Sequence, residues 1–121
     1  MINQMSIDEV IEQYSIPKKI LDEYHAFGLC DAVREVMGDW KYTEEDIERL
    51  SMIMTLHDIG FTIDEVETYM RLLIAGTKTE AKRMKMLNEK RAQTLDDIHF
   101  MEMQLDRMDY LRYEMNYDNK E

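Results

Sequence analysis

The chain has 121 residues, of which 45% are apolar and 34% charged, and its formal net charge at pH 7 is −11. This length allows one core and one extended element and excludes two large domains. No stretch reaches the roughly 18 consecutive apolar residues of a membrane span, and the N-terminus lacks the basic-then-apolar profile of a secretory signal. We therefore expect a cytoplasmic protein without a membrane partner.

The negative charge is concentrated in the first part of the chain. Residues 1–76 contain 16 acidic and 6 basic residues, whereas residues 77–121 contain 10 and 9. Affinity for nucleic acid comes largely from Lys and Arg, which displace counterions from phosphates. Any DNA-binding function must therefore depend on local basic residues and not on the overall field.

The composition predicts an all-α fold. Only four glycines and one proline interrupt a sequence that is otherwise rich in good helix formers. Pro17 suits the first turn of a helix, and Gly28, Gly60 and Gly76 fall where helices should end. Four further helix starts are marked by capping boxes, in which a hydroxyl residue and an acid three positions later bond to each other's backbone: Ser6 with Glu9, Thr43 with Asp46, Thr62 with Glu65, and Thr77 with Glu80.

The first two predicted helices are short and are joined by a tight connection around residues 14–16, which is typical of a helix-turn-helix. Their shared apolar core is predicted to contain Ile7, Val10, Ile11, Ile20, Leu21, Tyr24 and Phe27. From residue 29 to residue 42 the periodicity is lost, which predicts an irregular loop or a short hairpin in the place of a wing. Trp40 in this segment either packs the wing onto the head or serves as an exposed protein-binding anchor.

Two more helices are predicted near residues 43–58 and 62–75, packed as a second pair. The apolar positions of each recur at helical spacing and should face inward. They are Ile47, Leu50, Ile53 and Met54 in the first helix, and Ile63, Val66, Tyr69, Met70 and Leu73 in the second.

From about residue 78 to residue 115 no helix breaker occurs, so a single long helix is predicted. Apolar residues recur along it at alternating spacings of three and four, which is typical of a coiled-coil seam. No other segment is long enough to cover this seam, so we expect a homodimer about a two-fold axis. The expected interface residues are Met84, Leu87, Arg91, Thr94, Ile98, Met101, Leu105, Met108 and Met115, with Arg112 as a further polar interruption.

The order and spacing of these elements over residues 5–112 resemble the MerR family of bacterial transcriptional regulators. The matching stretches are SIDEV at 6–10, Leu21 and Tyr24 with FGL at 27–29, YTEEDIERL at 42–50, and GFTIDEV at 60–66. The resemblance implies a winged helix-turn-helix head at 1–76, a dimerisation helix at 77–115 whose copies pair antiparallel, and a flexible tail at 116–121. It also implies a dimeric regulator that binds double-stranded promoter DNA.

Six residues are the candidates for DNA contact. Lys18 and Lys19 lie in the first turn of the predicted recognition helix, Arg34 and Lys41 bracket the wing, and the resemblance adds Tyr24 and Tyr42. The alternative interpretation of the four basic residues is that they are merely solvated side chains.

Departures from the family pattern leave a second hypothesis open. Asp22 and Glu23 stand where the family has arginine and tyrosine, and Gly38-Asp39-Trp40 aligns with a glycine-tyrosine-arginine run. A relative that had lost DNA binding could use its acidic head as a protein-interaction module, binding a basic protein or acting as a DNA-mimicking anti-regulator.

The sequence gives no positive indication of catalysis, a cofactor or a metal site. The one cysteine, Cys30, is outside the long helix where metal-sensing relatives place theirs, and His25, His57 and His99 lack the spacing of a helical metal site. No phosphate-binding glycine loop or nucleophile motif is present. Tyr110, Tyr113 and Tyr117 form an aromatic end that either covers the partner head or binds a flat ligand.

Overall fold

The computed structural model of the protein describes residues 5–29, 34–36 and 39–118. In residues 34–36 and 39–41 only the backbone is described. The chain divides into two units, Met1–Arg83 and Met84–Glu121, which we treat separately as the head and the stem.

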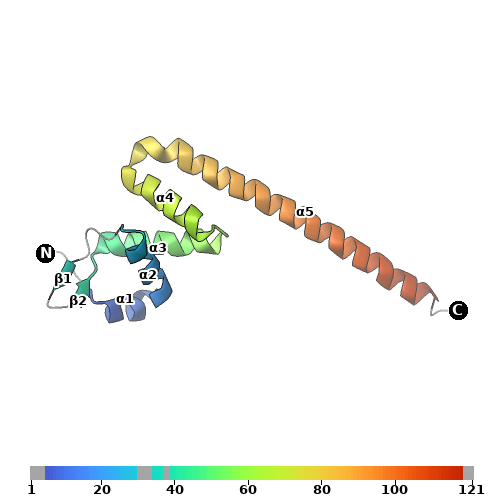
Figure 1. The fold of residues 1–121 in the computed structure, drawn as a ribbon. Coiled ribbons are helices and arrows are strands. Elements are labelled where there is room, and N and C mark those ends of the chain that lie inside the picture. The colour runs from blue at the N-terminus through green and yellow to red at the C-terminus, as the bar shows by residue number, and fades with distance from the viewer. Residues whose placement is uncertain (1–4, 30–33, 37–38, 119–121) are drawn as a thin grey trace. The chain divides into compact units, whose positions relative to one another are not determined.

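The head is built mainly from helices, as predicted (Figure 1). Its elements in chain order are α1 (Ile7–Tyr14), α2 (Lys18–Ala26), β1 (Arg34–Val36), β2 (Asp39–Lys41), α3 (Glu44–Asp58) and α4 (Ile63–Ala75). A 3₁₀ turn, η1 (Thr77–Thr79), leads into the long helix α5 (Glu80–Asp118), which continues from the head into the stem. The predicted all-α class with a short β wing is confirmed.

Helix starts follow the predicted caps at three of the four positions. The Ser6 side chain accepts a hydrogen bond from the Glu9 amide, and Thr43 and Thr62 form complete capping boxes with Asp46 and Glu65. These bonds satisfy amides that have no partner within the helix.

The predicted capping box at Thr77 is wrong. Gly76, with φ of 110°, ends α4, and a 3₁₀ turn without a side-chain cap follows it. The Thr79 hydroxyl instead donates toward the carbonyls of Leu72 at 2.6 Å and Gly76 at 2.8 Å. The long helix consequently begins at Glu80, two residues later than predicted, and extends to Asp118, three residues beyond the predicted end.

The turn between α1 and α2 is anchored by an apolar side chain. Ser15 adopts the left-handed conformation with φ of 54° and ends α1, and Pro17 caps α2 from an extended conformation. Between them Ile16 is only 1% exposed. Ile16 was not among the predicted core residues, because it falls in the connection between the two helices.

Most of the predicted core is confirmed. Val10, Ile20, Leu21, Tyr24 and Phe27 are buried, as are the inward positions of α3 apart from the partly exposed Met54. The prediction for Ile63 is wrong, because this first residue of α4 is 53% exposed.

The wing is a two-stranded antiparallel hairpin. Arg34 pairs with Lys41, Glu35 with Trp40, and Val36 with Asp39. Met5 and Tyr42 exchange two backbone hydrogen bonds, at 2.8 and 2.7 Å, so the segment before α1 is joined to the chain immediately after β2. This bridge holds the base of the wing beside the helix-turn-helix.

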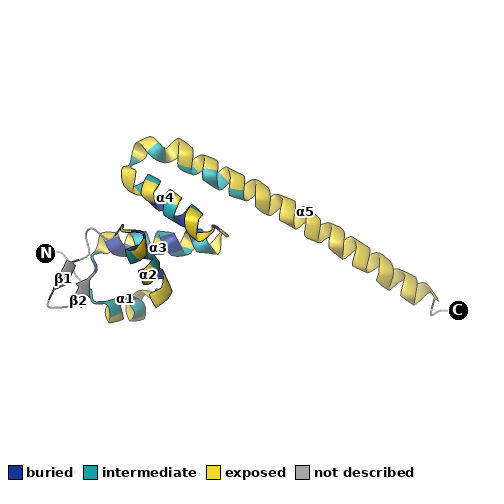
Figure 2. Cartoon of the chain, in the orientation of Figure 1, coloured by how far each residue is buried: buried dark blue, intermediate teal, exposed yellow. Residues whose placement is uncertain are grey.

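The stem is one helix with no buried residue (Figure 2). Large apolar side chains such as Met101, Leu105 and Met115 are each more than half exposed. Among the described residues, no helix is both long enough and apolar enough to cross a membrane.

Candidate nucleic-acid interface

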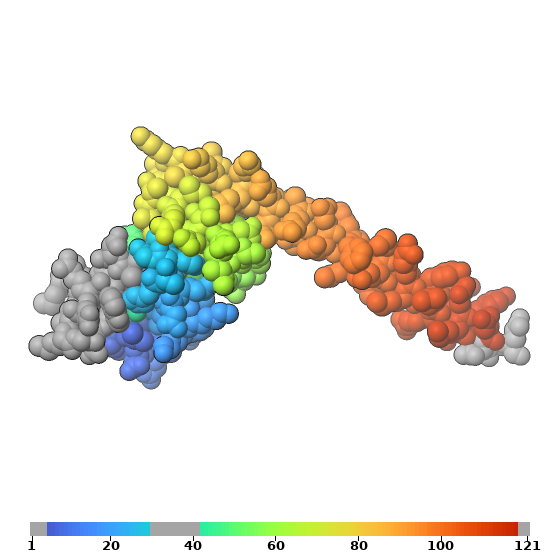
Figure 3. All heavy atoms as spheres, in the orientation of Figure 1, coloured from blue at the N-terminus to red at the C-terminus, as the bar shows by residue number. Residues whose placement is uncertain are grey.

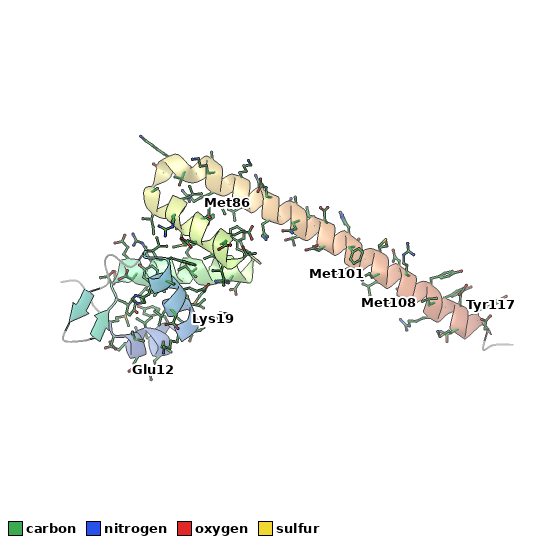
Figure 4. The ribbon with its side chains drawn as sticks, viewed as in Figure 1. Glu12, Lys19, Met86, Met101, Met108 and Tyr117 are labelled. Atoms are coloured by element: carbon green, nitrogen blue, oxygen red, sulfur yellow. The ribbon has the colours of Figure 1, made fainter. Side chains whose placement is uncertain are left out.

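Helix α2 has one face in the core and one face in solvent. Ile20, Leu21 and Tyr24 are buried, and at about 100° per residue these positions leave the opposite face to residues 18, 19, 22 and 26. Lys18, Lys19, Asp22 and Ala26 are all exposed. Atoms of α2 reach the surface of the head in Figure 3, and Lys19 points away from the core in Figure 4. The two predicted lysines therefore share a solvent face.

The two acids of α2 have different surroundings. Both carboxylate oxygens of Glu23 lie within hydrogen-bonding distance of His57 Nε2 on α3, at 2.8 and 3.0 Å. The Glu23 side chain is 11% exposed, whereas Asp22 is an exposed residue. Glu23 thus connects α2 to α3 and is not on the outward face. Its partner His57 lies 34 positions later in the chain, so local sequence patterns did not predict this contact.

Tyr24, which was predicted to contact DNA, has a structural role within the head. Its side chain is completely buried, and the hydroxyl donates a 2.6 Å hydrogen bond to Asp46 Oδ1. Asp46 Oδ2 in turn accepts from the amide and the hydroxyl of Thr43, at 2.9 and 3.0 Å. Burial, together with the Asp46 carboxylate, raises the pKa of Tyr24 far above its usual range, so the phenol stays protonated and donating.

Tyr42, the other tyrosine predicted to contact DNA, is also completely buried. Its hydroxyl lies 2.6 Å from His25 Nε2, and the two rings meet edge to face. Burial lowers the pKa of His25. Both tyrosines position α2 against the wing and α3.

Two arginines hold the turn that follows α2. Arg49 of α3 donates to the Leu29 carbonyl at 3.1 Å, and Arg71 of α4 donates to the Phe27 carbonyl at 2.7 Å. Each guanidinium also pairs with a glutamate one turn earlier in its own helix. Both guanidinium groups therefore make contacts within the head. The sequence did not predict this structural role.

The wing residues are placed only by their backbone. Arg34 and Lys41 are partners across the hairpin, which brings their Cα atoms together at its base. The side chains of Arg34, Asp39, Trp40 and Lys41 lie outside the described part of the structure, and Cys30 lies outside it entirely.

The predicted seam residues of the long helix are accessible. Most are exposed, and Leu87 is partly exposed. Met101 and Met108 project from one side of the helix and Tyr117 from the other (Figure 4). The tyrosine end, with Glu114 and Asp118, lines a shallow hollow of about 420 Å³ on the face opposite the seam.

Within the described residues, no group of three His, Cys, Asp or Glu side chains is placed to hold a metal ion. His25 and His57 are each engaged by a neighbouring side chain.

A helix-turn-helix with an exposed second helix, a two-stranded wing and a following helix pair defines a winged helix-turn-helix regulator. The family model described as the MerR HTH family regulatory protein matches residues 5–73. The chain belongs to this family and is a MerR-type transcriptional regulator, as the sequence resemblance predicted.

Known proteins extend the similarity beyond the head. A Haemophilus influenzae (strain Rd) protein named as a probable heavy metal-dependent transcriptional regulator is 28% identical over 93 residues, covering 76% of this chain and 72% of that protein. The structure of HiNmlR, a MerR family regulator lacking the sensor domain and bound to promoter DNA, superposes with a TM-score of 0.66 at 20% identity, covering 86% of this chain and 80% of that chain.

A MerR family regulator from Bacillus thuringiensis gives a TM-score of 0.62 at 22% identity, covering 88% of this chain and 94% of that one. A regulator assigned to the same family from Listeria monocytogenes gives 0.67 at 23% identity, covering 88% and 81%. The overall fold, including the long helix, is therefore shared.

Proposed function

We propose that this regulator binds double-stranded promoter DNA as a homodimer, with α2 of each head in a major groove and the wing at the flanking phosphates. The observation that carries the proposal is the outward face of α2, where Lys18 and Lys19 are exposed at the N-terminal end of the helix. In helix-turn-helix proteins this end of the recognition helix reaches base edges. HiNmlR, which shares the fold, was solved on promoter DNA.

The supply of positive charge is small. Of the six basic residues in 1–76, Arg49 and Arg71 donate to backbone carbonyls of the head, which leaves Lys18, Lys19, Arg34 and Lys41. A dimer then has eight such basic residues. This number is comparable to the roughly 6 to 10 phosphate contacts that a specific DNA-binding protein makes. Dimerisation therefore supports DNA binding directly, because residues 1–76 of a single chain would supply only four of these basic residues.

The charge distribution of the long helix supports antiparallel pairing. Residues 78–91 contain six basic and two acidic residues, whereas residues 96–118 contain two basic and seven acidic residues. Antiparallel copies place the basic part of each helix beside the acidic part of the other. Parallel copies would place like charges side by side, which is unfavourable at these short distances.

The seam itself also fits antiparallel pairing. The alternating spacings of three and four form the same series from either end of the seam. A two-fold axis between Ile98 and Met101 therefore places Met84 of one copy opposite Met115 of the other. The same register sets Arg91 and Arg112 opposite apolar partners. The aliphatic parts of the two arginine side chains can pack in the interface while their guanidinium groups reach solvent.

The heavy-metal dependence in the name of the Haemophilus relative is a property of that protein. The sequence has one cysteine, and the described residues contain no cluster of metal ligands. The alternative of an acidic protein-interaction module or DNA mimic is not favoured, because the family and its DNA-bound member point to promoter recognition.

Fluorescence anisotropy with a labelled fragment of the promoter of the chain's own gene tests the proposal at 50 and 200 mM salt. We expect Lys18→Gln with Lys19→Gln to weaken binding and to flatten the salt dependence, because each phosphate contact releases counterions. Lys78→Gln with Lys82→Gln is the control that removes the same charge away from α2, compared at protein concentrations at which sedimentation shows both variants and the wild type to be dimers. Equal weakening by both pairs, or no binding by the wild type at low salt, would overturn the proposed site.

A further inference from the structure

Asp22 is an acid on the surface that should face DNA. It lies four residues after Lys18 on the outward face of α2, about 40° away around the helix. Since Glu23 is held by His57, Asp22 is the one acid of α2 on this face. A carboxylate there repels phosphates and is compatible with tight binding only if a donor on the DNA compensates for it.

Among the described residues of the head, none forms an ion pair with Asp22. His25, three residues further along α2, has its Nε2 engaged by the Tyr42 hydroxyl, and its burial lowers its pKa and disfavours the charged form. Lys18 and Asp22 instead stand on the rim of a hollow of about 290 Å³, whose remaining lining is Ile7, Leu21, His25 and Tyr42. The Asp22 carboxylate is therefore left as an acceptor directed outward from the recognition helix.

The edges of the bases in the major groove offer two kinds of donor. Cytosine presents its N4 amino group, and adenine presents its N6 amino group beside the acceptor N7. An ionised carboxylate only accepts, so the N7 atom of adenine repels it, and the usual partner of Asp or Glu is cytosine N4. The ammonium group of Lys18, one turn earlier, is suited to the O6 and N7 acceptors of guanine.

We propose that Asp22 is a specificity-determining residue that selects cytosine at one position of each half-site. This inference rests on the proposed function, because it requires α2 to lie in the major groove. Without such a role the charge of Asp22 would only oppose DNA binding. With it, the carboxylate disfavours every base that presents no amino group at that position.

Selection from a randomised duplex pool, followed by anisotropy on the selected and single-base-changed duplexes, tests the assignment. We expect the wild type to prefer cytosine by about tenfold at one position in each half-site, the effect of one good base contact. Asp22→Asn should move that preference to adenine, because an amide can donate to N7 and accept from N6. Asp22→Ala should bind with little preference there.

Asp64→Asn at the start of α4 is the matched control, since it removes the same charge from another exposed position of the head. It should leave the base preference unchanged. If Asp22→Asn binds more tightly with the preference of the wild type at every position, Asp22 is only a repulsive charge and the inference is wrong while the proposed function stands. If the wild type selects no sequence and binds no duplex at 50 mM salt, both fail together.

Discussion

The hydrogen bond between Tyr24 and Asp46 connects the recognition helix to α3. Tyr24→Phe keeps the ring but removes the donor, and Asp46 retains only its bonds from Thr43. We expect the free energy of unfolding to fall by about 1.5–3 kcal/mol, the usual contribution of a hydrogen bond to a charged group. Urea denaturation measures the change.

The same variant distinguishes a structural role of the Tyr24 hydroxyl from a direct contact with DNA. A hydroxyl that stays completely buried cannot reach a phosphate. The folded Tyr24→Phe protein should therefore bind DNA as tightly as the wild type at low temperature. A loss of affinity without a loss of stability would show that the hydroxyl contacts DNA after all.

Ser15 is the one described non-glycine residue with a positive φ, at 54°. Left-handed backbone is costly for residues with a Cβ, and most of all for β-branched ones. We expect Ser15→Gly to unfold at the same urea concentration as the wild type or a higher one. Ser15→Val should lower the free energy of unfolding by about 1–2 kcal/mol. Equal stability of the two variants would contradict the strain assigned to this turn.

Among the helices, the two threonines that precede α4 and α5 offer a direct comparison. The Thr62 hydroxyl accepts from the Glu65 amide at 3.2 Å, whereas no side chain caps η1 at Thr77. Thr62→Ala should therefore cost about 1 kcal/mol of stability. Thr77→Ala should change the free energy of unfolding by less than about 0.5 kcal/mol. Thermal unfolding followed by circular dichroism distinguishes them.

Local signals explain why the elements could be predicted from the sequence. The caps at Thr43 and Thr62 and the glycine at position 60 act within one helical turn, so the bounds of α3 and α4 follow from neighbouring residues. Thr77 carried the same pattern, but the backbone at Gly76 set a 3₁₀ turn instead. A capping motif predicts a helix start only where the preceding backbone allows it.

The candidate site was predictable in part. Exposure of Lys18 and Lys19 follows from their position at the start of an amphipathic helix. Three other side chains have partners that are distant in sequence. Tyr24 donates to Asp46, and Glu23 contacts His57. Arg71 donates to a backbone carbonyl 44 residues earlier in the chain. Such distant partners are chosen by tertiary packing, which periodicity and capping do not encode.

At the scale of the whole molecule, the charge polarity of α5 predicts the direction of pairing. Lys82→Glu with Lys85→Glu should weaken self-association by about tenfold, because acidic ends would then face each other in an antiparallel dimer. Adding Glu114→Lys and Asp118→Lys to the same chain should restore the wild-type dimer. Sedimentation equilibrium measures both.

Parallel pairing leads to a different result for these variants. Like charges would already face each other in the wild type, so the two-residue and four-residue variants would associate as the wild type does. A monomeric wild type at micromolar concentration would instead remove the dimer on which the proposed DNA binding depends.

Arg49 and Arg71 stabilise the turn after α2, so two of the six basic residues in 1–76 make contacts within the head. Each head is then a weak ligand for a duplex, and tight occupancy needs the second head to bind while the first is still attached. Tethered binding raises the effective local concentration of the second head by orders of magnitude. When the protein concentration is close to the dissociation constant of the dimer, promoter occupancy should therefore rise more steeply than linearly with protein concentration. Modest changes in expression would then switch the promoter between empty and occupied.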